Sequence, residues 1–169
     1  FVEIMDEARD LSLELLGLSG NDYTSIFLQG GASSQFLMTA YNFLKNEAAF
    51  LDTGTWSKKA IKEAKLFGNV DDLASSENDK YNHIPNFEIA KNYDYFHCTS
   101  NNTIFGTQIN SFPNTDNPIF CDMSSDIFSR ALDFSKFDLI YAGAQKNLGP
   151  AGATLVVIKN DLLENIKDN

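Results

Sequence analysis

The chain has 169 residues, of which 43% are apolar, and its 13 Lys and Arg residues against 23 Asp and Glu residues give a formal net charge of −10. No apolar run approaches the roughly 18 residues of a membrane-spanning helix, so we expect no membrane protein. The acidic balance argues against nucleic acid as a partner, because such binding depends on clustered Lys and Arg. Two cysteines are too few for a disulfide framework, which favours a cytoplasmic protein.

Both ends of the sequence predict that the chain is part of a longer one. The first residue is not Met, and residues 1–16 already predict a helix with one apolar face made of Phe1, Ile4, Met5, Ala8, Leu11 and Leu15. Residues 160–169 form a polar stretch that resembles the start of another helix. We therefore expect a fragment, or a chain of which only part is present.

Between the ends, strands and helices alternate. The pattern predicts a strand over 23–28, a Gly-rich turn over 29–34, a helix over 35–44, a strand over 48–52 and a helix over 57–67. A polar surface loop is predicted over 71–91, and further strands over 95–99, 119–123, 137–142 and 154–158. Several of these strands are continuously apolar, which is typical of a sheet buried on both faces. We predict an α/β fold, a three-layer sandwich with a mostly parallel sheet and ligands at the carboxyl ends of its strands.

Two turns after predicted strands could meet a ligand. Residues 30–34, Gly-Gly-Ala-Ser-Ser, precede a helix, so their N–H groups and hydroxyls could hold a phosphate. A tight turn with a helix cap at Ser33 or Ser34 explains the same residues equally well. Trp56, the only tryptophan, follows a strand and could stack on a planar ligand, although a core or interface role also fits.

Two more turns carry charge in apolar surroundings. Asp122 ends an apolar strand, where a carboxylate needs a cation or several donors, and Ser124 and Ser125 could satisfy it in a simple turn. Lys146 stands among small and apolar residues that could desolvate its ammonium, as a Schiff-base lysine requires, while an ordinary loop lysine remains an alternative. A lysine, an acid, an aromatic ring and a helix N-terminus together are the parts that pyridoxal 5′-phosphate needs.

The segments that carry these residues resemble a known family. Residues 141–152, Tyr-Ala-Gly-Ala-Gln-Lys-Asn-Leu-Gly-Pro-Ala-Gly, are similar to the lysine signature of the phosphoserine aminotransferases, which are class V, fold-type I pyridoxal-phosphate enzymes. Three further segments, 50–57, 100–106 and 122–125, are similar to the same family in the same order. The resemblance therefore spans nearly the whole chain and implies the large domain of a fold-type I aminotransferase.

The resemblance also implies a role for single residues. Lys146 would form the Schiff base with the cofactor and act in catalysis, and Asp122 would pair with the pyridine nitrogen. Trp56 would stack on the ring, and Thr103 would donate a hydrogen bond to the phenolic oxygen of the cofactor.

The cofactor phosphate would be held by Ala32, Ser33 and Gln145. Other members of the family carry arginine at the position of Ser33, so this chain supplies less positive charge to the phosphate. No metal is expected, because the two histidines and two cysteines show no metal-ligand spacing.

The implied reaction transfers an amino group between L-glutamate and 3-phosphohydroxypyruvate and gives O-phospho-L-serine and 2-oxoglutarate. This is a step of serine biosynthesis, and a role in pyridoxine biosynthesis stays open. The family forms homodimers in which a second subunit completes the phosphate site. Residues 1–169 would be part of the large domain, with a substrate-binding His-Arg pair before the chain and a small C-terminal domain after it, so this chain alone would be incomplete.

Two alternatives remain open. Another class V enzyme, such as a serine–glyoxylate aminotransferase or a cysteine desulfurase, would usually show a histidine close before the lysine or a different stacking residue. A non-catalytic α/β module would use Lys146 and the turn at residues 30–34 only to bind an anion.

Overall fold

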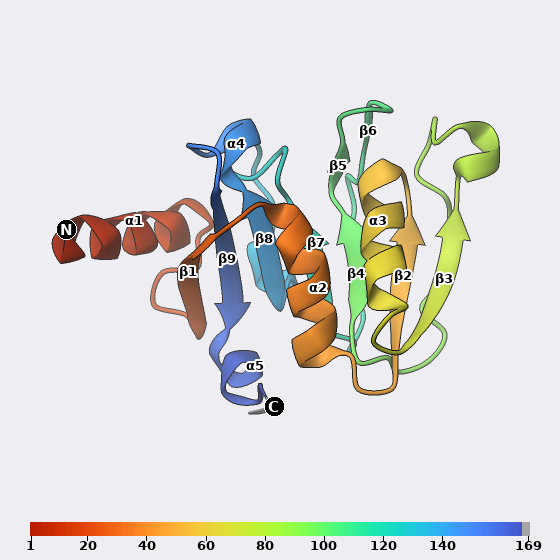
Figure 1. Ribbon diagram of the computed structural model, residues 1–169, viewed down its shortest axis with the longest axis horizontal. Helices are drawn as coiled ribbons and strands as arrows, with labels where there is room; N and C mark the ends of the chain where they lie inside the picture. Colours follow the sequence, from red (N-terminus) through yellow and green to blue (C-terminus); the bar gives the residue numbers. More distant parts are fainter. Residues whose placement is uncertain (167–169) are drawn as a thin grey trace.

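A seven-stranded sheet forms the centre of the computed structural model, which describes residues 1–166 (Figure 1). In chain order its strands are β1 (Tyr23–Gln29), β2 (Glu47–Asp52), β3 (Asn69–Ser75), β4 (Phe96–Thr99), β7 (Ile119–Asp122), β8 (Leu139–Gly143) and β9 (Ala153–Lys159). Their order across the sheet is β1-β9-β8-β7-β4-β2-β3. Because β9 is antiparallel to both of its neighbours and the other pairs are parallel, β9 alone runs against the rest. The predicted mostly parallel sheet is confirmed.

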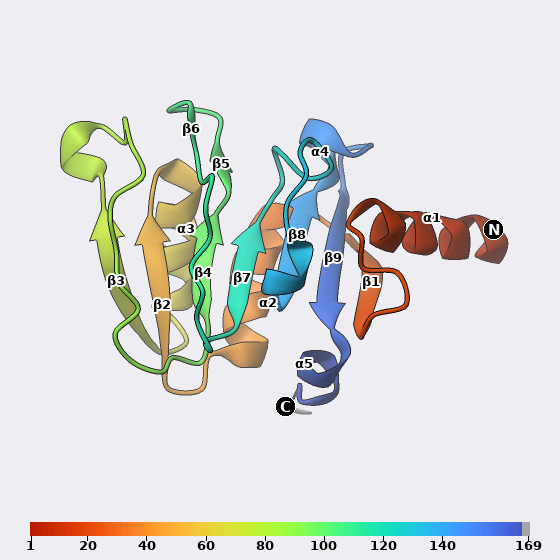
Figure 2. The same ribbon diagram turned by 180° about the vertical axis from the view of Figure 1, so that it is seen from behind.

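The helices that follow β1, β2 and β9 cover one face of this sheet, and mainly irregular segments cover the other (Figures 1 and 2). The α-helices are α1 (Val2–Leu15), α2 (Ala32–Phe43), α3 (Thr55–Ala64), α4 (Ala144–Asn147) and α5 (Asn160–Glu164). Two short 3₁₀ helices, Glu77–Asp79 and Phe134–Lys136, and a small hairpin of β5 (Asn101–Asn102) and β6 (Thr107–Gln108) complete the fold. In the described part of the chain, no helix combines the length and apolar character that a membrane crossing requires.

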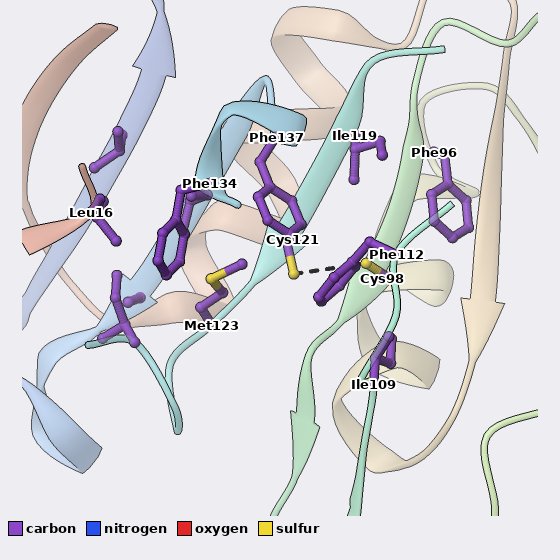
Figure 3. Close-up of a cluster of buried hydrophobic side chains, with 14 of the residues drawn as sticks. Leu16, Phe96, Cys98, Ile109, Phe112, Ile119, Cys121, Met123, Phe134 and Phe137 are labelled. Carbon is purple, nitrogen blue, oxygen red and sulfur yellow. Dashed lines mark hydrogen bonds between the residues drawn. The ribbon is translucent and has the colours of Figure 1, made fainter. Parts of the chain in front are cut away.

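Two apolar cores lie on the two faces of the sheet, which explains why β4, β7 and β8 are buried along their whole length. The core under α2 and α3 is rich in aromatic rings, among them Phe36, Phe43, Phe50, Tyr95, Phe120 and Tyr141. On the opposite face, Phe112 from an irregular segment and Phe134 from a 3₁₀ helix cover strand residues such as Cys121 (Figure 3). Burial on both faces matches the continuous apolar runs of the sequence.

Three sequence expectations need correction. Residues 71–75, predicted as part of a surface loop, belong to β3, an edge strand whose acidic Asp71 and Asp72 hid its strand character. The helices predicted from residues 35 and 57 begin earlier, at Ala32 and Thr55. The first helix is confirmed, but its apolar side chains are mostly exposed, and it extends away from the sheet (Figure 1).

The fold brings the chemically suggestive turns to one edge of the sheet. Since every strand of the seven-stranded sheet but β9 runs in the same direction, the turns after β1, β2, β7 and β8 all meet at the edge where these strands end. The helices α2, α3 and α4 begin there, and the β5–β6 hairpin stands at the same edge (Figure 1).

Candidate functional site

Lys146 and Trp56 lie next to each other at this edge. Trp56 is in the first turn of α3, directly after β2, and Lys146 is in α4, directly after β8. The Lys146 Nζ atom lies 5.0 Å from the centre of the Trp56 ring, and Lys59 Nζ lies 4.5 Å from it. The indole N–H of Trp56 is buried and has no partner among residues 1–166. Lys146 itself is exposed, so the described residues do not form the desolvating environment that the sequence predicted.

Asp122 ends β7 and is only 5% exposed. Its Oδ1 atom accepts hydrogen bonds from the Ser124 amide at 3.0 Å and the Ser124 hydroxyl at 2.6 Å. The contacts of Ser124 are those expected if Asp122 is satisfied in a simple turn. Ser125 instead bonds to Asn101. Burial raises the pKa of Asp122, against the effect of the Ser124 hydrogen bonds and the nearby positive charge of Lys146.

One serine joins the acid to the lysine turn. The Ser124 hydroxyl donates to Asp122 and accepts the N–H of Gly143 at 3.0 Å, and Gly143 lies just before α4. Sequence reasoning gave Ser124 only the role of satisfying Asp122. Its second bond links the end of β7 to the end of β8, which holds Asp122 at a fixed place relative to the helix that carries Lys146.

The turn at residues 30–34 approaches the same place. Gly31 caps α2 without any side-chain hydrogen bond, so the predicted cap at Ser33 or Ser34 is wrong. The Ala32 and Ser33 N–H groups therefore stay available to an anion, whereas the Ser34 N–H donates to the Gly31 carbonyl oxygen at 3.0 Å. A methyl group added to Gly143 would lie 3.2 Å from the Ala32 amide nitrogen and 2.9 Å from Gln145 Oε1, so these two groups converge. Ser33 is exposed.

Thr103 forms no side-chain contact of its own with the other predicted site residues in the described hydrogen-bond network. It is exposed in the turn of the β5–β6 hairpin, and no hydrogen bond joins its side chain to Lys146, Trp56 or Asp122 within the described chain. A buried hydroxyl that the sequence did not single out lies beside Asp122, because Thr99 is paired with Asp122 across β4 and β7. Thr99 Oγ1 has no partner among residues 1–166. Its place at the end of a central strand was the only signal for it.

Together these groups could hold an elongated ligand. The α2 N-terminus suits an anion, the Trp56 face suits a flat ring, and Asp122 suits a cationic N–H. The Lys146 amine lies beside the Trp56 ring, where it could react with an electrophilic carbon of the ligand. No cluster of three or more potential metal ligands occurs in the described part of the chain.

Comparisons with known proteins show which family the chain belongs to. The family model described as "Aminotransferase class-V" matches residues 1–168. The phosphoserine aminotransferase of Flavobacterium johnsoniae is 66% identical over 96% of this chain and 47% of its own length. That of Bacillus subtilis is 52% identical over 98% of this chain and 47% of its own length. The chain thus spans about half the length of the curated relatives it matches.

Solved structures agree with these relatives. The phosphoserine aminotransferase of Bacillus circulans subsp. alkalophilus superimposes with a TM-score of 0.93 at 45% identity and covers 98% of this chain and 47% of that one. A structure described as showing radiation damage of the Schiff base in phosphoserine aminotransferase gives a TM-score of 0.91 at 48% identity over 95% of this chain and 46% of its own. An alanine–glyoxylate aminotransferase from Nostoc, at 12% identity and a TM-score of 0.69, shares the fold alone.

Proposed function

Because this chain belongs to the class-V aminotransferase family, we propose that it is part of a phosphoserine aminotransferase that uses pyridoxal 5′-phosphate. The full-length protein would transfer an amino group between L-glutamate and 3-phosphohydroxypyruvate and release O-phospho-L-serine and 2-oxoglutarate, a step of serine biosynthesis. The observation that carries this proposal is the meeting of a lysine and a tryptophan ring beside a buried carboxylate, because Lys146 lies 5.0 Å from the Trp56 ring and its charge acts on Asp122. The similarity to named phosphoserine aminotransferases supports it.

The described residues fit the cofactor. Asp122 has a second oxygen, Oδ2, that accepts no hydrogen bond from residues 1–166, and a protonated ring nitrogen is the partner that such a buried carboxylate lacks. Trp56 presents a ring face next to Lys146. The N-terminal amides of α2 lack a side-chain cap and suit the phosphate.

Each residue would then have a defined task. When bound, the cofactor supplies a pyridinium ring that takes up the electron pair left at the substrate Cα. Asp122 would hold the proton on the ring nitrogen, and Trp56 would lie against the ring. Lys146 would hold the cofactor covalently at rest, and its free amine would then move a proton to and from Cα as general base and acid. Thr103 would donate to the phenolic oxygen.

The turn at residues 30–34 would bind the phosphate mainly through uncharged groups. The Ala32 amide nitrogen and the Gln145 side-chain amide converge near Gly143. The Ala32 N–H and the Gln145 Nε2 group would donate to the phosphate oxygens. Ser33 would add a hydroxyl group where other family members place arginine. The helix N-terminus would therefore supply most of the positive potential that the turn offers.

The remaining parts of the enzyme would come from outside this chain. We infer that residues 1–169 form part of the large cofactor-binding domain, and that a small C-terminal domain supplies further substrate contacts. A second subunit of a cytoplasmic homodimer would complete the phosphate site. The two free cysteines, Cys98 and Cys121, fit a reducing compartment.

Turnover by the full-length protein tests the proposal. With pyridoxal phosphate present, L-glutamate and 3-phosphohydroxypyruvate should give O-phospho-L-serine, and Lys146→Ala should abolish this activity. Lys62→Ala, a change of an exposed lysine on α3, should leave it unchanged. Activity retained by Lys146→Ala would refute the role of the lysine, and turnover of glyoxylate or L-cysteine instead would favour another class V reaction. Phosphate binding without turnover would favour a non-catalytic module.

A further inference from the structure

Asp52 is a buried carboxylate that the proposed chemistry does not use. It ends β2, is 6% exposed, and forms no ion pair with any of residues 1–166. A buried carboxylate without a cation is costly unless several donors satisfy it. Here the donors are hydroxyl groups: Ser57 lies 3.1 Å from Oδ1, while Ser75 and Tyr81 lie 2.8 Å and 3.1 Å from Oδ2.

Through Ser57, Asp52 reaches the turn that presents Trp56. The Ser57 Oγ atom accepts the N–H groups of Thr53 and Gly54, both at 2.9 Å, so it closes the turn between β2 and α3. Its one proton has two acceptors within reach, the Gly54 carbonyl oxygen at 2.8 Å and Asp52 Oδ1 at 3.1 Å. Because Trp56 directly precedes Ser57 in the first turn of α3, this network sets the position from which the indole extends.

Through Tyr81, Asp52 reaches the β5–β6 hairpin that carries Thr103. The rings of Tyr81 and Phe105 pack with their centres 4.8 Å apart. Phe105 lies in the hairpin turn together with Thr103, and its N–H donates to the Asn102 carbonyl at 3.2 Å. Burial and the negative charge of Asp52 raise the pKa of Tyr81 to about 12, so the phenol keeps its proton and remains a donor.

The turn between β2 and α3 and the β5–β6 hairpin also contact each other. A methyl group added to Gly54 would lie 3.0 Å from Asn102 Oδ1 and 3.1 Å from the Phe105 ring, so the turn and the hairpin pack tightly. The Thr53 hydroxyl adds a long contact of 3.4 Å to Asn102 Oδ1. A shift at Asp52 would therefore move both segments relative to each other.

We propose that Asp52 is a positioning residue. It fixes the position of the Trp56 turn relative to the Thr103 hairpin, so that both meet the same cofactor ring. Asp52 itself contacts neither of these side chains within the described structure. The inference rests on the proposed function, because it concerns the placement of groups that would contact pyridoxal phosphate.

The test uses the full-length protein with pyridoxal phosphate as the probe. Asp52→Ala should weaken cofactor affinity about tenfold or more, which corresponds to about 1.4 kcal/mol. At saturating cofactor it should also change the circular dichroism of the cofactor absorption band, a signal of ring orientation that loss of stability alone does not move. Asp52→Asn should be intermediate, because its amide oxygen still accepts from hydroxyl groups while its NH₂ group cannot.

Asp72→Asn is the matched control, since Asp72 lies on neighbouring β3 and pairs with Lys65 at the surface at 2.9 Å. It should leave the affinity and the dichroism unchanged. If Asp52→Ala does not fold, Ser57→Ala and Tyr81→Phe each remove one hydroxyl group and should each change the dichroism. Variants that bind the cofactor with wild-type affinity and dichroism would overturn the role of Asp52 alone. A wild-type protein that fails to bind the cofactor would instead overturn the proposed function.

Discussion

Lys146 and Trp56, far apart in the sequence, lie side by side, with the lysine Nζ atom 5.0 Å from the centre of the indole ring. The contact arises because β2 and β8 run in the same direction and end at the same edge of the sheet, where the helices that follow them begin. A flat ligand bonded to the amine would therefore come close to the aromatic face.

Gly143→Ala should disturb the candidate phosphate site. The added methyl group would lie 3.2 Å from the Ala32 amide nitrogen, so the Ala32 backbone or the Gly143 turn would have to shift. We expect a loss of about 1–3 kcal/mol in the free energy of unfolding. Pyridoxal-phosphate affinity of the full-length protein should also fall, as measured by equilibrium titration. Gly149→Ala is the control, because its methyl group would meet nothing within 4 Å; equal effects of both changes would contradict this account.

Arg130→Ala should destabilise the fold strongly. The Arg130 guanidinium pairs with Asp126 at 3.0 Å, and the two side chains are 20% and 4% exposed. Asp126 also accepts a hydrogen bond from buried Ser100. Removing the arginine would leave a buried carboxylate without its cation, at a cost of about 3–5 kcal/mol in urea unfolding.

The other arginine provides the comparison. Arg9 pairs with Asp6 at 3.0 Å on α1, where the side chains are 45% and 56% exposed. Solvent screens such a pair, so Arg9→Ala should change the free energy of unfolding by less than about 1 kcal/mol. A similar cost for both changes would show that Asp126 does not depend on its partner.

His97 should make the fold sensitive to acid. Burial lowers the pKa of His97 to about 3, from an ordinary value of 6.5, while its Nε2 atom lies 2.8 Å from the Tyr141 hydroxyl. Between these two pH values the unfolded chain binds a proton that the folded chain does not. The stability from neutral His97 is thus fully present above pH 6.5 and is lost as the pH falls, by up to about 1.4 kcal/mol per pH unit.

Urea unfolding at a series of pH values measures this slope. His97→Gln should flatten it over the same pH window, because glutamine takes up no proton. His83→Gln, a change of the exposed histidine, should retain the wild-type slope. Wild-type and His97→Gln curves that run parallel would refute the buried neutral state of His97.

The central sheet could be predicted from the sequence because its strands are buried on both faces, and their continuous apolar runs record that burial. The edge strand β3 could not, since only β2 pairs with it and its polar residues meet solvent. The exposure of the α1 side chains could not be predicted from the sequence either. An apolar helical stripe indicates a face that can pack, but it does not indicate whether another part of the described chain covers that face.

The candidate site, too, could be predicted from the sequence only in part. Residues directly after strands, such as Asp122 and Trp56, could be singled out because strand direction brings strand ends together. The second bond of Ser124 and the network around Asp52 depend on which side chains meet across the sheet edge, and no local pattern encodes that. The exposure of Lys146 differed from expectation because small neighbours do not bury a long side chain.

Reductive trapping tests the central claim most directly. The full-length protein is incubated with pyridoxal phosphate, reduced with borohydride, digested, and analysed by peptide mapping. We predict a pyridoxyl group on Lys146 as the dominant product, lost in Lys146→Ala. A label spread over the surface lysines of α3, such as Lys59 and Lys62, or no label at all, would contradict the assignment of this chain as the cofactor-binding part of an aminotransferase.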